Sequence, residues 1–230
     1  MKEVTKCYKL GGENIQALDN VSFEIGGGEY VAITGPSGSG KSTLMNIIGC
    51  LDLPDSGLYE LAGTDTKAFS GRQLAKLRNT HIGFIFQGFN LIPDLDLFDN
   101  VDVPLRYRGM PAAERKLRIE DSLGLVGLGS RMKHYPNELS GGQQQRAAIA
   151  RALAGSPRLL LADEPTGNLD SQMARSVMEL LEDINAQGTT VVMVTHDPEL
   201  AARAQRNVHI VDGVATDVER RPALVEPTGA

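Results

Sequence analysis

Residues 35–42 of this 230-residue chain read GPSGSGKS, which has the composition and spacing of a phosphate cradle. Glycines at these positions let backbone N–H groups turn inward around phosphate oxygens, and a helix that starts behind them adds partial positive charge. Lys41 is expected to reach the β- and γ-phosphates, which makes it a catalytic candidate, and Ser42 is expected to ligate Mg²⁺. The expected phosphate contacts are Gly35, Pro36, Ser37, Gly38, Ser39, Gly40, Lys41, Ser42 and Thr43. We call residues 35–42 the glycine loop; alone, it predicts a nucleoside triphosphate without a reaction.

Two adjacent acids follow a buried apolar run and supply the next chemistry. The run at 158–163, RLLLAD, is typical of a parallel strand buried on both faces, and Asp163 stands at its carboxyl end. A carboxylate there can hold Mg²⁺, whereas Glu164 points elsewhere and can orient a water molecule. The alternative is a solvated strand end before a turn at Pro165. Because a phosphate cradle lies upstream, we favour the interpretation in which Asp163 binds the metal and Glu164 orients the water. Together these roles imply hydrolysis.

Two further polar residues end apolar runs in the same way. His196 follows VVMVT, and Gln87 follows IGFIF. The carboxyl ends of parallel strands meet at one edge of a sheet, so we expect both side chains near the γ-phosphate. His196 would contact that phosphate, and Gln87 would touch both Mg²⁺ and the attacking water. The alternative for each is an ordinary polar loop residue.

A second glycine-rich segment, LSGGQ at residues 139–143, opens another expected helix. Ser140 and Gln143 form a capping box, so the segment could simply be a helix start. Capping does not require two glycines, which are costly in a first turn, but Gly141 and Gly142 do offer bare N–H groups to an anion. This second glycine segment begins 98 residues after Lys41. The two glycine sites need not face each other within one chain, and a second copy would then supply the partner.

Composition narrows the class of protein. The chain is 41% hydrophobic and 23% charged, with a net charge of −6, so it reads as a soluble globular protein without the basic footprint that duplex nucleic acid requires. Cys7 and Cys50 lie in no CxxC or Cys/His cluster, which argues against a zinc or redox site. No stretch approaches the ~20 apolar residues of a spanning helix. Any membrane role is expected to come through a partner.

The pattern of elements predicts an α/β fold, a P-loop NTPase core with a mostly parallel sheet. The run YVAIT at 30–34 reads as the strand before the glycine loop, with Leu44, Ile47, Ile48 and Leu51 on one face of the helix after it. A strand at 158–163, a helix marked by Met173 to Ile184 and a strand at 190–195 form a βαβ unit.

Three further regions complete the expected single domain of residues 1–220. An N-terminal antiparallel β subdomain is expected within the first 30 residues, because VSFEI alternates and three glycines follow it. A helical subdomain at about 88–157 is expected as an insertion, with Phe98, Val101 and Leu105 on one helix face and Pro111 as a first helical residue. The core would comprise 1–87 and 158–220, and 221–230 reads as a poorly ordered tail.

Taken in order, the glycine loop, Gln87, LSGGQ, the Asp163–Glu164 pair and His196 make the chain resemble the ATP-binding subunit of an ABC transporter. The resemblance implies ATP and Mg²⁺, and a head-to-tail homodimer in which each ATP lies between one glycine loop and the partner's Ser140, Gly141, Gly142 and Gln143. It also implies that Tyr8 stacks on adenine and that Asp170, in GNLD, crosses the dimer interface. Only seven residues precede Tyr8, so the strand that carries it is expected to be short.

The sequence between the motifs, such as IGFIFQGFNLIPDL at 82–95, most resembles the branch of this family that serves macrolide export, lipoprotein release and related efflux. This implies a separate integral membrane permease and a cytoplasmic location on the inner face of the membrane. The apolar residues after Gln87 either form the core of the helical subdomain or dock the permease; they are Phe89, Leu91, Ile92, Leu95, Leu97 and Phe98.

Three rival functions stay open. A soluble DNA-maintenance ATPase shares the head design, but the separation of 98 positions from Lys41 to Leu139 leaves no room for its long coiled coil. A metabolic P-loop kinase has no use for LSGGQ or for Glu164. A soluble regulatory member of the family also fits a chain without a membrane segment.

Overall fold

The structure, a computed structural model, describes residues 1–220, so the expected tail at 221–230 lies outside the described residues. Its main sheet has six strands in the order β11-β10-β3-β9-β8-β7. The strands from β10 to β7 are parallel, and β11 pairs antiparallel with β10. The expected α/β fold with a mostly parallel sheet is confirmed. The bounds are β3 Tyr30–Thr34, β7 Ile82–Phe86, β8 Leu159–Asp163, β9 Thr190–Val194, β10 Arg206–Val211 and β11 Val214–Arg220.

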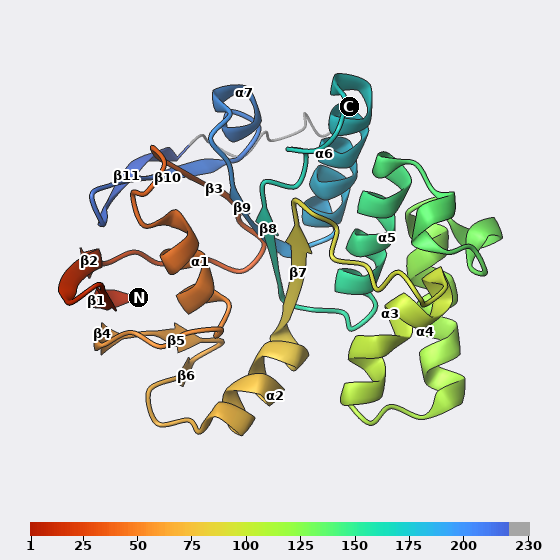
Figure 1. Ribbon diagram of the computed structural model, residues 1–230, viewed down its shortest axis with the longest axis horizontal. Coiled ribbons are helices and arrows are strands. Elements are labelled where there is room, and N and C mark those ends of the chain that lie inside the picture. The colour runs from red at the N-terminus through yellow and green to blue at the C-terminus, as the bar shows by residue number, and fades with distance from the viewer. Residues whose placement is uncertain (221–230) are drawn as a thin grey trace, which may run out of the picture.

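Helices cover both faces of this sheet, because the buried strands carry apolar side chains on both sides. One face packs on α3 to α7, and the other packs on α1, α2 and a separate antiparallel sheet. Figure 1 shows α3, α4 and α5 gathered beside β7, with α1 beyond β8 on the other side. The bounds are α1 Lys41–Ile48, α2 Gly71–His81, α3 Leu97–Tyr107, α4 Ala112–Leu125, α5 Gly141–Leu153, α6 Ser171–Ala186 and α7 Pro198–Ala201.

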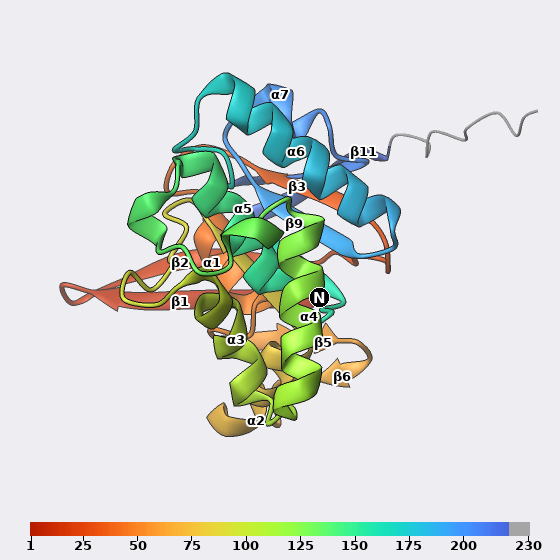
Figure 2. The same ribbon diagram turned by 90° about the vertical axis from the view of Figure 1, so that its right-hand side faces the viewer.

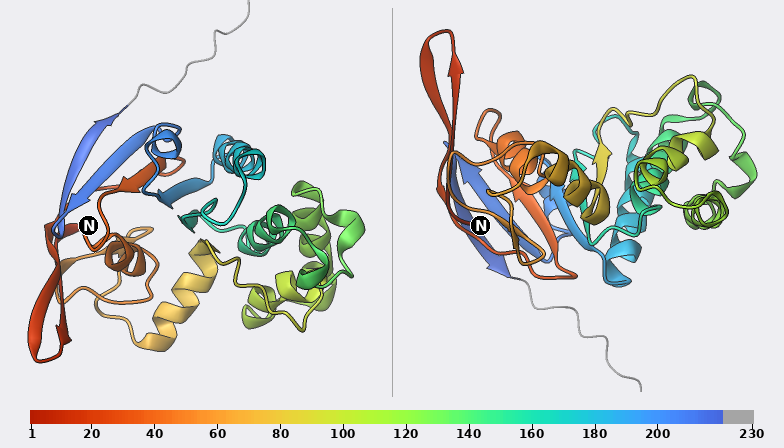
Figure 3. Two further views of the ribbon diagram at one scale, coloured as in Figure 1. Left: turned by 45° about the horizontal axis from the view of Figure 1, so that its top comes forward. Right: turned by 90° about the horizontal axis from the view of Figure 1, so that it is seen from below.

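The antiparallel sheet is present, although the VSFEI segment at 21–25, which indicated it, lies mostly outside its strands. It has the order β2-β1-β4, from β1 (Lys2–Leu10), β2 (Glu13–Val21) and β4 (Ser56–Leu58). Only the first residue of VSFEI belongs to β2; Phe23 and Ile25 alternate inward because an extended segment packs on the core. The expectation of a short first strand is also wrong, since β1 has nine residues. The β1–β2 ribbon extends away from the body, opposite α3 and α4 (Figures 2 and 3).

Smaller differences concern where helices begin and end. Leu51 lies outside α1 and is 50% exposed, because the chain leaves the helix at Gly49. Pro111 is the N-cap of α4 rather than its first residue. The sequence reading also missed α2 and the β10–β11 hairpin. Short elements complete the chain: β5 Glu60–Leu61, β6 Thr64–Asp65, and the 3₁₀ turns η1 Gly129–Arg131 and η2 Pro136–Glu138.

Candidate functional site

The strand register brings the predicted chemistry to one edge of the sheet. Phe86 pairs with Asp163, Asp163 with Val194, and Val194 with Ile33, so the carboxyl ends of β7, β8, β9 and β3 stand in line. The residues that leave those ends are the glycine loop, Gln87, Glu164 and His196. Sequence reasoning could find this edge because short buried strands end where their apolar runs end.

The glycine loop depends on close backbone approach at both of its ends. Gly35 has φ 147°, and a Cβ there would lie 2.1 Å from the carbonyl oxygen of Ile210 in β10. Gly40 has φ 106°, and its Cβ would lie 2.3 Å from the carbonyl oxygen of Ala17 in β2. Gly38, also left-handed, faces open space. Strands β10 and β2 therefore contact the two ends of the loop, whereas Gly38 in its middle is open to an approaching anion.

Helix α1 starts directly behind this open side. Gly40 is its N-cap and has no side chain to accept hydrogen bonds from the N–H groups of the first turn. The Nζ atom of Lys41 donates to the carbonyl oxygens of Gly35, at 2.8 Å, and Pro36, at 2.7 Å. The ammonium group thus lies against the first two residues of the loop. The N–H groups of the first helical turn lack intrahelical partners. This arrangement suits an anionic group with several oxygens.

Asp163 lies half-buried at the end of β8. Burial raises the pKa of its carboxyl above the ordinary value of 3.8; Glu164 raises it further, while the charge of Lys41 lowers it. A buried carboxyl beside another acid is a poor place for isolated negative charge, and a cation would relieve both effects. Among residues 1–220 no group of three or more His, Cys, Asp or Glu side chains could hold a metal ion. A cation here would therefore need oxygen ligands from Ser42, Gln87, phosphate or water.

Glu164 and His196 lie in direct contact across two strand ends. The Oε1 atom of Glu164 is 2.8 Å from Nδ1 of His196, and the side chains are 25% and 71% exposed. Glu164 has a left-handed backbone, φ 43°, which is unusual for a residue with a Cβ. The Glu164 carboxylate contacts His196 from this turn. The pair sits at the solvent side of the edge, where a water molecule can enter.

Gln87 lies beside the segment that follows Glu164. Its Nε2 atom donates to Oδ1 of Asn168 at 3.3 Å, and Nδ2 of Asn168 donates to the Gln87 carbonyl at 3.0 Å. A Cβ on Gly167 would lie 2.5 Å from the Gln87 amide. The structure thus brings Gln87 to the Glu164 turn and leaves its side chain exposed.

Tyr8 is held near the start of α1 by a charged cluster. Its hydroxyl donates to Asp52 at 2.9 Å, and its phenol also interacts with Thr43. Lys6 donates to the other Asp52 oxygen at 2.9 Å and lies 5.3 Å from the centre of the Tyr8 ring. Burial, followed by the Asp52 bond, raises the pKa of Tyr8. The ring is therefore fixed beside the glycine loop, with Lys6 over one face.

The second glycine segment lies at the start of α5, away from the glycine loop. The predicted capping box is confirmed, with Ser140 and Gln143 bonded in both directions. A Cβ on Gly142 would lie 2.8 Å from the sulfur of Met173 in α6, whereas one on Gly141 would make ordinary contacts with Leu169 and Phe89, at 3.5 and 3.7 Å. Asp170, which is exposed, caps α6 through bonds to Gln172 and Met173. Within this chain, the glycine loop and the second glycine segment rest on different elements.

Two polar residues of α5, a half-buried arginine and a fully buried glutamine, escaped sequence reasoning. Arg151 donates to the carbonyls of Phe89 and Asn90, two left-handed residues just after Gln87, and burial lowers its pKa. Gln145, which is 0% exposed, donates to the Pro165 carbonyl. Both carry polar groups inside an otherwise apolar helix face. That mismatch is visible in the sequence, but its partners are not, because they lie far away along the chain.

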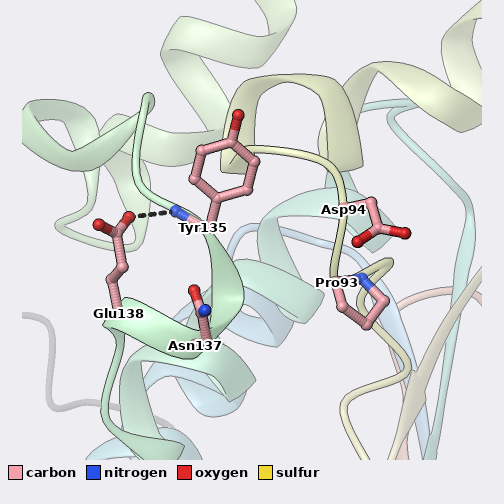
Figure 4. A pocket seen from close by; sticks show the side chains of 5 residues that line it. All are labelled: Pro93, Asp94, Tyr135, Asn137 and Glu138. Atoms are coloured by element: carbon pink, nitrogen blue, oxygen red, sulfur yellow. Dashed lines mark hydrogen bonds between the residues drawn. The ribbon is translucent and has the colours of Figure 1, made fainter.

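The apolar residues after Gln87 divide between core and surface. Leu97 is fully buried and Leu91 and Phe98 pack against the same core, whereas Ile92 is 42% exposed. Next to Ile92 a pocket of about 370 Å³ is lined by Pro93, Asp94, Tyr135, Asn137 and Glu138 (Figure 4). No helix within the described residues is long and apolar enough to span a membrane.

Comparison with known proteins agrees with this geometry. A family model described as ABC transporter matches residues 18–167. The ABC transporter ATP-binding protein YknY of Bacillus subtilis is 51% identical over 213 residues, which are 93% of each chain. The macrolide export ATP-binding/permease protein MacB of Shigella flexneri is 47% identical over 98% of this chain, which spans only 34% of that protein.

Solved structures lead to the same family. A dimeric structure of the ATP-binding cassette MJ0796, in a post-hydrolysis state bound to ADP and Pi, is 46% identical with a TM-score of 0.87. The match covers 97% of this chain and 98% of the cassette. A further dimeric structure of MJ0796, described as a bacterial ABC transporter cassette, matches equally well. The chain therefore belongs to the ABC transporter family, as an ATP-binding subunit.

Proposed function

We propose that this chain binds ATP with Mg²⁺ and hydrolyses it at the seam of a head-to-tail homodimer, and that the cycle of closing and opening powers a separate membrane permease. The observation that carries the proposal is the edge of the sheet, where the glycine loop, Asp163, Glu164, Gln87 and His196 meet. A purely binding protein has no need of the Glu164–His196 pair beside a phosphate cradle.

Nucleotide binding is assigned to the glycine loop and its surroundings. Lys41 exchanges its bonds to loop carbonyls for bonds to phosphate oxygens, while the N–H groups of 35–43 receive the remaining oxygens. Tyr8, held by Asp52, offers the ring face opposite Lys6 to adenine. Asp163, Ser42 and Gln87 would hold Mg²⁺ through their oxygen atoms, and the bound ion would neutralise phosphate charge.

Hydrolysis is assigned to groups around the γ-phosphate position. Glu164 orients and deprotonates the attacking water, and His196 contacts the γ-phosphate while holding Glu164 through its Nδ1. Gln87 contacts the water from the other side. Phosphoryl transfer asks a protein mainly for positioning and charge stabilisation, and a group supplied in trans contributes ~10³ to 10⁵ in rate in other NTPases. Ser140, Gly141, Gly142 and Gln143 of a second copy are assigned that role here, with Asp170 at the same interface.

ATP is assigned most of the closing energy of the homodimer. Two chains of net charge −6 repel each other weakly, and salt screens this repulsion within about 10 Å. The dimeric state of the solved cassettes supports the arrangement. The chain alone then hydrolyses ATP slowly, because its γ-phosphate is contacted on one side only.

The membrane partner is assigned to the face that carries Ile92 and the neighbouring pocket. This face combines exposed Ile92 and Tyr135 with polar pocket residues and follows Gln87 in the chain, so a permease helix docked there would respond to movement at the nucleotide. Relatives that are named macrolide export proteins support efflux of an antibiotic, a peptide or a lipoprotein. The chain would work in the cytoplasm, on the inner face of the membrane. No observation favours a soluble ATPase in DNA maintenance: α2, β7, α3 and α4 fill the span from Lys41 to Leu139, without a coiled coil.

Glu164→Gln tests the proposal. This variant keeps the shape of the site and loses the base. It should therefore bind ATP and form a dimer that does not dissociate, because the ATP is not hydrolysed. Size-exclusion chromatography with saturating Mg·ATP should show a dimer for Glu164→Gln and mostly monomer for the wild-type chain after turnover. A Glu164→Gln chain that stays monomeric, or that hydrolyses ATP like wild type, would refute the proposal.

A further inference from the structure

Gln145 is a buried polar residue whose amide is only half satisfied. Its side chain lies inside α5 and is 0% exposed. The Nε2 atom donates to the carbonyl oxygen of Pro165 at 2.7 Å, while Oε1 has no hydrogen-bond partner within residues 1–220. The unpartnered Oε1 is destabilising, whereas methionine would remove it but leave the Pro165 carbonyl without its donor, so the two costs offset each other. Stability alone therefore does not explain a glutamine at this position.

The group that Gln145 holds belongs to the turn that presents Glu164. Glu164 has a left-handed backbone, which persists only where its surroundings impose it. Its N–H donates to the Val194 carbonyl at 2.9 Å, and its carbonyl accepts from the N–H of Gly167 at 3.0 Å. The Pro165 carbonyl, bonded to Gln145, is the third fixed point. Strand β9 and the turn supply two of these constraints, and α5 supplies the other.

The start of α5 rests on the same segment of chain. Gly142 packs so closely on Met173 that a Cβ would lie 2.8 Å from its sulfur, and Gly141 faces Leu169. The second glycine segment therefore packs on Leu169 and Met173, which follow the turn at 164–167 in the chain. A displacement of α5 reaches the Pro165 carbonyl through a single hydrogen bond.

We propose that Gln145 is a positioning residue that orients Glu164 through the Pro165 carbonyl, and so couples the second glycine segment to the hydrolytic carboxylate. This inference rests on the proposed function, because it assigns Glu164 the role of base. It adds a route inside one chain by which contact of residues 139–143 with a partner's ATP sets the catalytic geometry.

Gln144 offers a matched control. It is the neighbouring glutamine, and its Nε2 donates to the carbonyl of Leu139 at 3.1 Å, within the start of its own helix. Gln144→Met and Gln145→Met change the same atoms in adjacent positions, but only the second removes the bond to Pro165.

The experiment measures kcat, KM and melting temperature of the full chain with Mg·ATP. Gln145→Met should lower kcat by about tenfold or more, since small misplacements of catalytic groups have effects of this order, with KM changed by less than about twofold. Its melting temperature should stay close to that of wild type, because one unpartnered buried acceptor replaces another, and its ATP-bound dimer should accumulate in size-exclusion chromatography. Gln144→Met should behave like wild type.

A double-mutant comparison separates positioning from general damage. In a Glu164→Gln background, Gln145→Met should cause no further loss of the residual rate, because the group that it positions is already gone. Wild-type kcat in Gln145→Met, or a further loss in the double variant, would overturn the inference while leaving the proposed function in place. A wild-type chain that does not hydrolyse ATP would instead contradict the proposed function itself.

Discussion

Two helices of this chain begin on glycine-rich residues, and the two starts are built differently. Helix α1 begins at a left-handed Gly40 without a side-chain cap, and Lys41 closes over its open N–H groups. Helix α5 begins at Ser140, whose side chain and that of Gln143 cap the helix in both directions. The start of α1 has a cation and uncapped N–H groups, so it can bind an anion without help from another site. The start of α5 has no cation in its first turn, so it complements a site built elsewhere.

The glycines of the two starts also have different causes. Gly35 and Gly40 are required inside the chain, because a Cβ on either would meet a backbone carbonyl at 2.1 or 2.3 Å. Gly141 has ordinary space around its missing Cβ. Within residues 1–220 a Cβ at Gly141 meets only ordinary contacts, so we assign the need for glycine there to a second copy. The contrast supports a cradle completed by a second copy.

Gly141→Asp should have the largest effect and would break the comparison if it had none. The new Cβ would make only ordinary contacts with Leu169 and Phe89, and an acid in the first turn stabilises a helix, so the chain should fold normally. The carboxylate would repel the partner's γ-phosphate, and ATP turnover should fall by about 10³-fold if the second glycine segment contributes as trans groups do elsewhere. Steady-state turnover with circular dichroism as a folding control measures this. Wild-type turnover would remove the role assigned to residues 139–143.

Substituting alanine for glycine at each helix start compares the two starts by the free energy of unfolding. Gly40→Ala puts a Cβ on a backbone with φ 106° and against the Ala17 carbonyl, so the free energy of unfolding should fall by more than about 1 kcal/mol. Gly141→Ala should leave it unchanged or raise it by up to about 1 kcal/mol, because alanine favours the helix. Urea titration of both variants without nucleotide measures the difference. Equal destabilisation would show that Gly141 also has an internal cause.

The smallest expected effect concerns pH and the carboxyl that faces the glycine loop. Burial, above all, holds the pKa of Asp163 above 3.8 in the folded chain, so the folded state binds more protons than the unfolded state just above that pH. The contribution of Asp163 to stability should therefore decrease as the pH rises from about 4 through the folded-state pKa. Asp163→Asn should lack this decrease and be the more stable variant at pH 7 without Mg²⁺. Identical pH profiles in urea titrations would contradict the assignment.

The sequence was sufficient to place the chemistry at one sheet edge, because β3, β7, β8 and β9 are short buried strands whose ends coincide with polar residues. It was less informative about the antiparallel parts. VSFEI alternates as a strand would, yet its burial comes from packing beside the core. The β10–β11 hairpin was missed although Asp212-Gly213, both left-handed, is a recognised turn pair.

The contacts of Gln145 and Arg151 lay beyond any reading of local pattern. Each joins α5 to a backbone carbonyl from another part of the chain, at Pro165 and at Phe89 and Asn90. The left-handed backbone of Glu164 was equally invisible, since the surrounding hydrogen bonds impose it rather than the residue type. Periodicity and motif spacing report on neighbours along the chain, whereas these features depend on partners in space.

Mixing two inactive variants tests most directly whether the catalytic pocket is shared between two copies. Lys41→Ala lacks a working glycine loop, and Gly141→Asp lacks a working second glycine segment, so each alone should be nearly inactive. In an equimolar mixture about half of the dimers pair unlike chains, and each of these has one intact seam, so turnover should recover to about a quarter of the wild-type rate. If the mixture gave only the sum of the two separate rates, the two glycine sites would not act on one ATP across a dimer.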